Sequence, residues 1–127
     1  MWMQNTLSTY TRQMNKLRRD LYNLLQDYHS VDYPERSLFL AVIFQALLDA
    51  TKPEVHDESK QAIYHRERAI GWFNASIGVT AANFSEICDM ADLDYKHVRN
   101  FAYKVIHSKE KTFIRHRLNK LLHSERM

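Results

Sequence analysis

Apolar residues recur at helical spacing through most of this chain. The first such stripe alternates steps of three and four residues, and its members are Leu7, Tyr10, Met14, Leu17, Leu21, Leu24 and Tyr28. This period predicts an amphipathic helix over residues 7–29. The stripe either packs on the chain's own domain or forms a homodimer seam through residues 7–28, because about three heptads is near the minimum for a coiled coil.

Segment 34–77 is predicted to hold the core helices. Residues 35–51 are apolar on most sides, which indicates a central helix buried by several neighbours. Pro34 fits the first turn of this helix, and Pro53 ends it. A third helix is predicted from about residue 57 or 59 to residue 76. Its wet face would be 65–68, and its inner stripe would be Ile63, Ala69, Ile70, Phe73 and Ile77. Gly78 is predicted to cap its end, and Asn83 to cap the start of the next helix.

Two short helices joined by a tight turn are predicted over residues 83–107. The first stops at Asp92, after apolar residues at helical spacing, which are Phe84, Ile87, Cys88 and Ala91. The second starts after Asp94 as N-cap and buries Val98, Ala102 and Val105. A basic last helix is predicted over 109–123. No segment has a convincing strand pattern, so the predicted fold class is all-α, with about six helices in a single domain, 1–127.

The composition excludes several function classes. With two Gly and two Pro, the chain lacks the glycine-rich loops that bind nucleotides. Its single cysteine, Cys88, allows no intramolecular disulfide and no Cys-based zinc site, which fits a cytoplasmic location. The seven His show no metal-ligand spacing, so no metal, no cofactor and no enzyme activity are expected. No apolar run approaches the roughly 20 residues of a bilayer span, so no membrane partner is expected.

Positive charge is concentrated in the last third of the chain. From Lys96 onward there are nine Lys or Arg and two acids, a net charge of +7, whereas residues 1–95 have a net charge of −4. An acidic body with a basic C-terminal part is typical of a protein that places one face on a polyanion.

Segment 83–107 matches the pattern of a helix-turn-helix that binds double-stranded DNA. Cys88 stands at the small-residue position of the first helix, Leu93 and Val98 stand at the buried aliphatic positions, and Asp92 replaces the usual Gly at the turn. Asp tolerates the left-handed conformation better than most residues. The second helix would face the DNA with Tyr95, Lys96, His97, Arg99, Asn100, Tyr103 and Lys104. The last helix would contact phosphates with Lys109, Lys111, Arg115, Arg117 and Lys120.

The same region resembles small proteins encoded in phages and prophages of α-proteobacteria, including activators of phage-like gene transfer agents. The matching residues are Trp72, Phe73, Phe84, Ile87, Cys88, Ala91, Leu93, Asp94, Val98 and Arg99, with Asp92 again in place of Gly. The resemblance implies transcriptional control of phage-type genes, with a contact between the rest of the body and RNA polymerase.

Two other functions are compatible with this pattern. A helical protein–protein interaction module, such as a phage-encoded inhibitor or adaptor, would use the basic surface on an acidic partner protein. A DNA-packaging or recombination accessory protein would use the same helix-turn-helix motif. Sequence-specific binding of double-stranded DNA is the function that the sequence favours.

Overall fold

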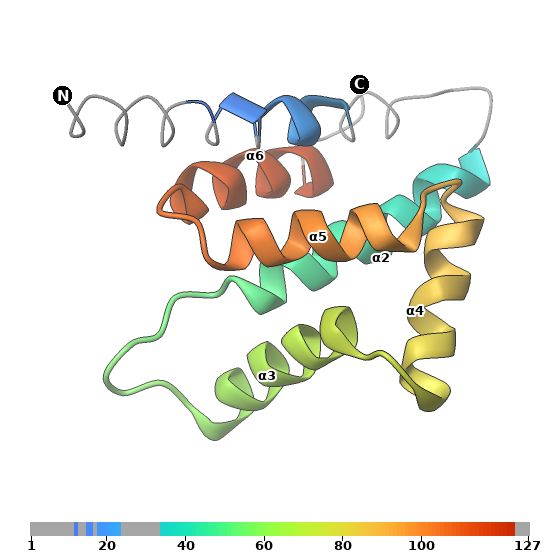
Figure 1. Cartoon of the computed structure of the whole chain (residues 1–127). Helices are drawn as coiled ribbons and strands as arrows, with labels where there is room; N and C mark the ends of the chain where they lie inside the picture. Colours follow the sequence, from blue (N-terminus) through green and yellow to red (C-terminus); the bar gives the residue numbers. More distant parts are fainter. Residues whose placement is uncertain (1–11, 13–14, 17, 24–33, 124–127) are drawn as a thin grey trace, which may run out of the picture.

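The computed structural model describes residues 12, 15–16, 18–23 and 34–123, and every regular element in these ranges is helical. Five helices have defined bounds: α2 (Pro34–Ala50), α3 (Lys60–Asn74), α4 (Gly78–Met90), α5 (Tyr95–Ile106) and α6 (Lys111–His123). The described residues between 12 and 23 are also helical, and we call them the N-terminal helical segment. The prediction of an all-α chain is confirmed for the described residues, among which there is no strand (Figure 1).

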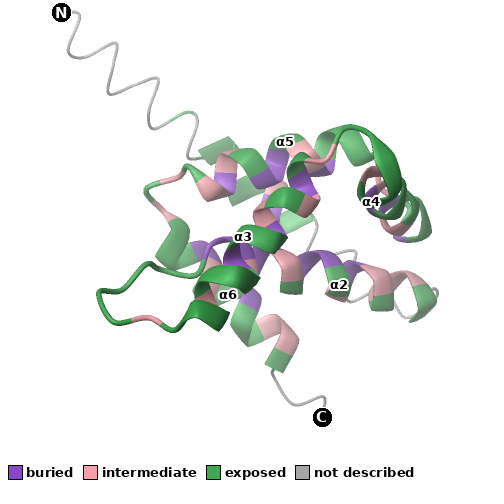
Figure 2. Cartoon of the chain, turned by 90° about the horizontal axis from the view of Figure 1, so that it is seen from below, coloured by how far each residue is buried: buried purple, intermediate pink, exposed green. Residues whose placement is uncertain are grey.

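Helix α2 is the centre of the fold. It contacts α3, α4, α5 and α6, and its inner side chains Leu40, Ile43, Phe44 and Leu47 are fully buried. A helix that is apolar on most sides is stable in water only when several neighbours cover it. The prediction that 35–51 forms the central core helix is therefore confirmed. Figure 2 shows the buried residues where the helices meet and the exposed ones along the outer side of α4.

Three arginines, which we call the helix-end arginines, bind the C-terminal ends of helices far away in the sequence. Arg36 donates to the carbonyl of Ala91 after α4, over 2.9 Å. Arg99 donates to two carbonyls at the end of α3, and Arg115 donates to the Leu48 carbonyl of α2. The last carbonyls of a helix lack intrahelical donors and lie at its negative end. Each helix-end arginine therefore stabilises one helix terminus and joins it to another helix.

The boundary between α3 and α4 differs from the prediction. Helix α3 ends at Asn74, and α4 begins at Gly78, so Gly78 (φ +86°) starts a helix rather than capping one. Asn83 lies inside α4, where its side chain accepts a hydrogen bond from the Trp72 indole over 2.9 Å. The end of α3 needs no glycine cap, because Arg99 occupies its terminal carbonyls. Since the chain turns extended at 75–77, Ile77 is 86% exposed instead of lying on an inner stripe.

Helix α3 also presents its faces differently from the prediction. Arg66, predicted to lie on the wet face, is buried and forms an ion pair with Glu58, with 2.9 Å between Nη1 and Oε2. This hydrogen bond lowers the pKa of the Glu58 carboxyl below its usual value. Ile63, predicted to be inward, is 36% exposed. The buried face of α3 therefore includes a charged residue, and through it α3 is connected to the loop that follows α2.

The N-terminal helical segment packs on the chain's own domain where it is described. Leu21 is buried in the common core. Arg18 donates through Nε to Glu110 over 2.9 Å and lies over the Phe113 ring, 4.9 Å from its centroid. These contacts favour the intramolecular alternative at this end of the stripe. The positions 7, 10, 14, 17, 24 and 28 of the predicted dimer seam lie outside the described residues.

Candidate nucleic-acid interface

The turn between α4 and α5 has the hydrogen bonds of a Schellman motif. The Leu93 N–H donates to the Cys88 carbonyl and the Asp92 N–H to the Asp89 carbonyl, each over 2.9 Å. Asp92 is left-handed, with φ of 60°, and it is the non-glycine residue with positive φ among those described. This conformation is the one that glycine adopts most easily. Asp92 therefore takes the backbone conformation that the predicted turn requires, although it lacks the usual glycine.

Helix α5 is fixed by its cap and by its inner face. The Asp94 side chain accepts a hydrogen bond from the Lys96 N–H over 2.9 Å, which satisfies one of the free donors at the helix start. Val98, Phe101, Ala102 and Val105 are buried against the core. The N-cap and the buried face predicted for this helix are both present.

Cys88 and the aromatic residues of α3 and α4 hold the first helix of the pair in place. The Trp72 and Phe84 rings meet edge to face, with centroids 4.8 Å apart, and Phe73 meets both. Cys88 is fully buried below the turn, and this burial raises the pKa of its thiol to about 12. The thiol is thus a small packing group, as expected for a buried cysteine outside an electropositive site.

The outer face of α5 presents polar side chains to solvent. Lys96, Asn100 and Tyr103 are exposed and recur at steps of four and three, which places them on one side of the helix. The Tyr103 ring lies 4.4 Å, centroid to centroid, from the ring of His107, also exposed. His97 is exposed, Lys104 is half-buried, and Tyr95 is 36% exposed at the helix start.

Arg99, predicted to approach the bases, points into the fold instead. Its Nε donates to the Phe73 carbonyl over 3.0 Å and its Nη2 to the Ala75 carbonyl over 2.6 Å. Its guanidinium also lies over the rings of Phe84 and Tyr95, 5.6 and 5.5 Å from their centroids. Four contacts within the chain occupy this side chain, so Arg99 belongs to the scaffold that positions α5.

One of the five residues predicted to contact phosphates in and before α6 is bound within the fold. Arg115 is half-buried and donates to the Thr51 hydroxyl over 3.0 Å, besides its bond to the end of α2, and burial lowers the pKa of its guanidinium. Lys109, Lys111, Arg117 and Lys120 are exposed.

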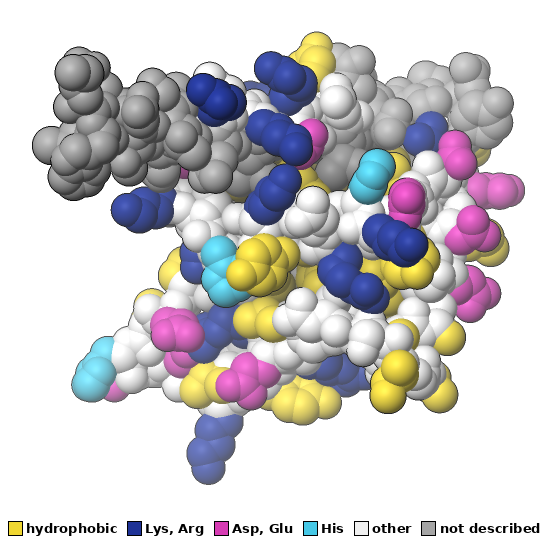
Figure 3. Space-filling view, in the orientation of Figure 1, with side chains coloured by type: hydrophobic (Ala, Val, Ile, Leu, Met, Phe, Trp, Pro, Cys, Tyr) yellow, Lys and Arg dark blue, Asp and Glu magenta, His cyan; other side chains and the backbone are white. Residues whose placement is uncertain are grey.

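Charge is separated on the face that contains α5. Figure 3 shows Lys and Arg side chains over the N-terminal helical segment and the centre of this face, and Asp and Glu side chains along the edge where α4 lies. The exposed acids at the end of α4 and in the turn are Glu86, Asp89, Asp92 and Asp94. Acidic side chains therefore surround the start of α5, whereas Lys104 lies in its last turn.

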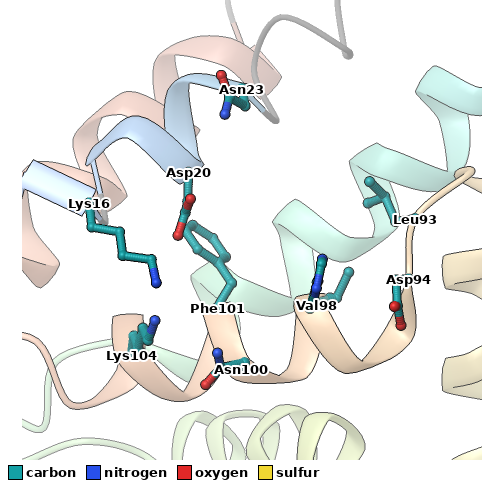
Figure 4. Close-up of a pocket in the computed structure, with 10 residues that line it drawn as sticks. Lys16, Asp20, Asn23, Leu93, Asp94, Val98, Asn100, Phe101 and Lys104 are labelled. Atoms are coloured by element: carbon teal, nitrogen blue, oxygen red, sulfur yellow. The ribbon is translucent and has the colours of Figure 1, made fainter. Parts of the chain in front are cut away.

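A cavity of about 360 Å³ lies between the N-terminal helical segment and α5 (Figure 4). Lys16, Asp20 and Asn23 line it from the segment, and Asn100 and Lys104 line it from α5. Sequence reasoning missed the three residues of the segment. The helical period of the sequence shows that Lys16 lies off the apolar stripe. It does not show that the N-terminal helical segment lies beside α5.

The comparisons with known proteins identify no relative. No protein-family model, curated protein or solved structure matches this chain. Within the described residues, no group of three or more His, Cys, Asp or Glu side chains could hold a metal ion. None of the helices described in the structure is long and apolar enough to cross a membrane.

Proposed function

We propose that this protein binds double-stranded DNA through the outer face of α5 and regulates the transcription of phage-type genes. The observation that supports this most directly is the turn before α5. Asp92 is left-handed there, and the Schellman hydrogen bonds end α4 just ahead of a capped second helix. A short helix, a tight turn and an exposed polar second helix form the arrangement with which helix-turn-helix proteins contact the major groove.

The exposed residues of α5 have the chemistry that base recognition requires. Asn100 offers an amide that pairs with the N6 and N7 edge of adenine, and Lys96 offers an ammonium to guanine acceptors. Tyr103 and Lys104 follow on the same helix, where they would meet a thymine methyl or a phosphate. Arg99 is left out of this proposed set because its donors are bound to the end of α3.

The proposal is tested by selecting bound sequences from random duplex DNA with the full chain. The selected duplex is then titrated at salt concentrations from about 50 to about 200 mM, over which phosphate contacts weaken steeply. We expect Lys96→Ala to weaken binding and Asn100→Ala to relax the preference at one base pair, by about tenfold. Lys60→Ala is the matched control, because it removes one exposed lysine at the start of α3, remote from α5 in Figure 1. The proposal is wrong if the native chain binds no duplex at low salt.

A second candidate function, protein binding, is favoured by an open groove on another side of the molecule. The groove has a volume of about 1440 Å³ and is lined by α2, α3, α4 and the end of α6. Three apolar side chains at its border are exposed: Leu38 by 64%, Ile77 by 86% and Val79 by 87%. Contiguous exposed apolar residues are typical of protein interfaces.

This candidate is tested by comparing native and variant chains as bait in the native host. The double variant Ile77→Ser with Val79→Ser should lose a specific partner that the variant Lys96→Ala retains. A partner lost equally in both variants would not be bound by the groove, and retention in both would exclude the groove as its site.

A further inference from the structure

The cavity between the N-terminal helical segment and α5 brings two lysines from distant parts of the sequence together. Lys16 enters from the segment and Lys104 from α5, and Figure 4 shows their side-chain ends directed toward each other. Neither lysine forms an ion pair with a described residue in the structure. Asp20 is the acid that lines the cavity beside Lys16, and Asp94 lines its far end.

Two converging ammonium groups repel each other unless an anion lies between them. The lining adds hydrogen-bond donors on one wall, because Asn100 and His97 both belong to it. Apolar side chains line the cavity too, and we call Leu93, Val98 and Phe101 its apolar wall. The cavity therefore fits a group that has a negative end and an apolar body.

We propose that this cavity binds one backbone phosphate of double-stranded DNA, held jointly by Lys16 and Lys104, with the adjoining deoxyribose against the apolar wall. This inference rests on the proposed function, because Asn100 and Lys104 belong to the same face of α5 that would contact DNA. It adds the N-terminal helical segment to the interface. A phosphate fixed beside Asn100 would set the register in which that side chain meets a base.

The number of phosphates is measurable from the salt dependence of binding. Each phosphate contact contributes about 0.9 to the slope of log affinity against log salt for duplex DNA. If Lys16 and Lys104 share one phosphate, the double variant Lys16→Gln with Lys104→Gln lowers the slope by about 0.9, whereas two separate phosphates would give about 1.8. Each single variant is expected to weaken binding, and the double variant to weaken it less than the two effects combined.

Two controls accompany these variants. Lys60→Gln should leave both affinity and slope unchanged, since Lys60 starts α3 and does not line the cavity. Thermal unfolding of each variant, followed by circular dichroism, should match that of the native chain. Lys16 is exposed, and among the described residues of the segment it is Leu21 and Arg18 that contact the rest of the fold.

The possible results separate this inference from the proposed function. A native chain that binds no duplex overturns both. Native-like affinity in Lys16→Gln, or a slope change of about 1.8 in the double variant, overturns the shared phosphate site and leaves DNA binding by α5 standing. A further experiment titrates the native chain with inorganic phosphate, followed by NMR, to test whether the cavity binds a free phosphate. Shifts at residues 16, 97, 100 and 104, combined with DNA binding that is insensitive to Lys16→Gln, would assign the cavity to a free phosphorylated ligand and overturn the DNA assignment.

Discussion

Replacing Arg99 by alanine should lower the stability of the fold. We expect this loss of stability, rather than the loss of a direct contact with DNA, to be the main effect of the substitution. The change removes two hydrogen bonds, to the carbonyls of Phe73 and Ala75, together with the guanidinium contacts to Phe84 and Tyr95. The C-terminal carbonyls of α3 then lose these donors, and α5 loses one of its connections to α3. Both consequences follow from the fold alone, with no DNA present.

The size of the effect can be worked out from these contacts. A hydrogen bond to a charged group contributes about 1.5 to 3 kcal/mol, and a cation–π contact at an exposed site contributes about 0.5 to 1 kcal/mol. The lower ends of these ranges, taken over the four contacts, add up to about 4 kcal/mol. Arg99 is half-buried and the freed carbonyls can bind water, so we expect about half of this sum to be lost. The expected loss is about 2 kcal/mol in the free energy of unfolding. For a chain of 127 residues this lowers Tm by about 7 °C.

The assay is urea unfolding of the native chain, Arg99→Ala, Arg99→Lys and Lys96→Ala, with DNA affinity measured in parallel. Arg99→Lys keeps the charge but lacks the planar fork that reaches two carbonyls, so it should lose about 1 kcal/mol or more. Lys96→Ala should change the free energy of unfolding by less than about 0.5 kcal/mol. If Arg99→Ala unfolds like the native chain while its affinity for DNA collapses, and Arg99→Lys retains that affinity, the structural role of Arg99 is refuted.

Two further predictions concern the turn before α5 and the buried cysteine of α4. Asp92→Gly should raise the free energy of unfolding by about 0.5 kcal/mol, because relief of left-handed strain outweighs the added freedom of the unfolded chain. Asp92→Val should lower it by about 1 kcal/mol or more, and equal stability of the two variants in urea would contradict the geometry. The Cys88 thiol, with a pKa raised to about 12, should stay unmodified by maleimide at pH 8 and react on unfolding. Rapid labelling of the folded chain would contradict the burial of Cys88.

The features that could be predicted from the sequence are those that depend on residues within the same helix. The all-round apolar pattern of 35–51 places α2 at the centre, since only a surrounded helix can have so few polar positions. The two-sided pattern of α5 identifies its buried residues, among them Val98 and Val105, because the helical period determines which side chains share a face. Asp94 is likewise identifiable as an N-cap from its place before the pattern.

The roles of the arginines were not predictable, because they depend on partners distant in the chain. Arg99 bonds to Phe73, 26 residues earlier, and Arg115 to Leu48, 67 residues earlier. A charged side chain in a helical pattern is normally solvated, so the sequence favours an outward position for it. The end of α3 was not predictable for the same reason. A distant arginine binds its carbonyls there, in place of the glycine cap that the local sequence pattern predicts.

The net positive charge of the last third of the sequence therefore differs from the charge that the folded protein presents on the proposed DNA-binding face. Arg99 and Arg115 belong to that excess, yet both bind backbone carbonyls inside the fold. Lys16 lies outside it, yet it shares a cavity with Lys104. The surface charge near α5 is thus assembled from both ends of the sequence, and its net value depends on packing.

The charges around α5 also determine how a duplex would lie on it. Asp92 and Asp94 are exposed at the N-terminal end of the helix, with Asp89 beside them on α4, and phosphates are repelled there. Lys104 and Lys16 lie at the other end. In helix-turn-helix proteins the first residues of the second helix commonly contact the bases. In this protein we expect the contact with the bases to lie nearer the middle of α5. Asn100 rather than Tyr95 would then determine the preferred base pair.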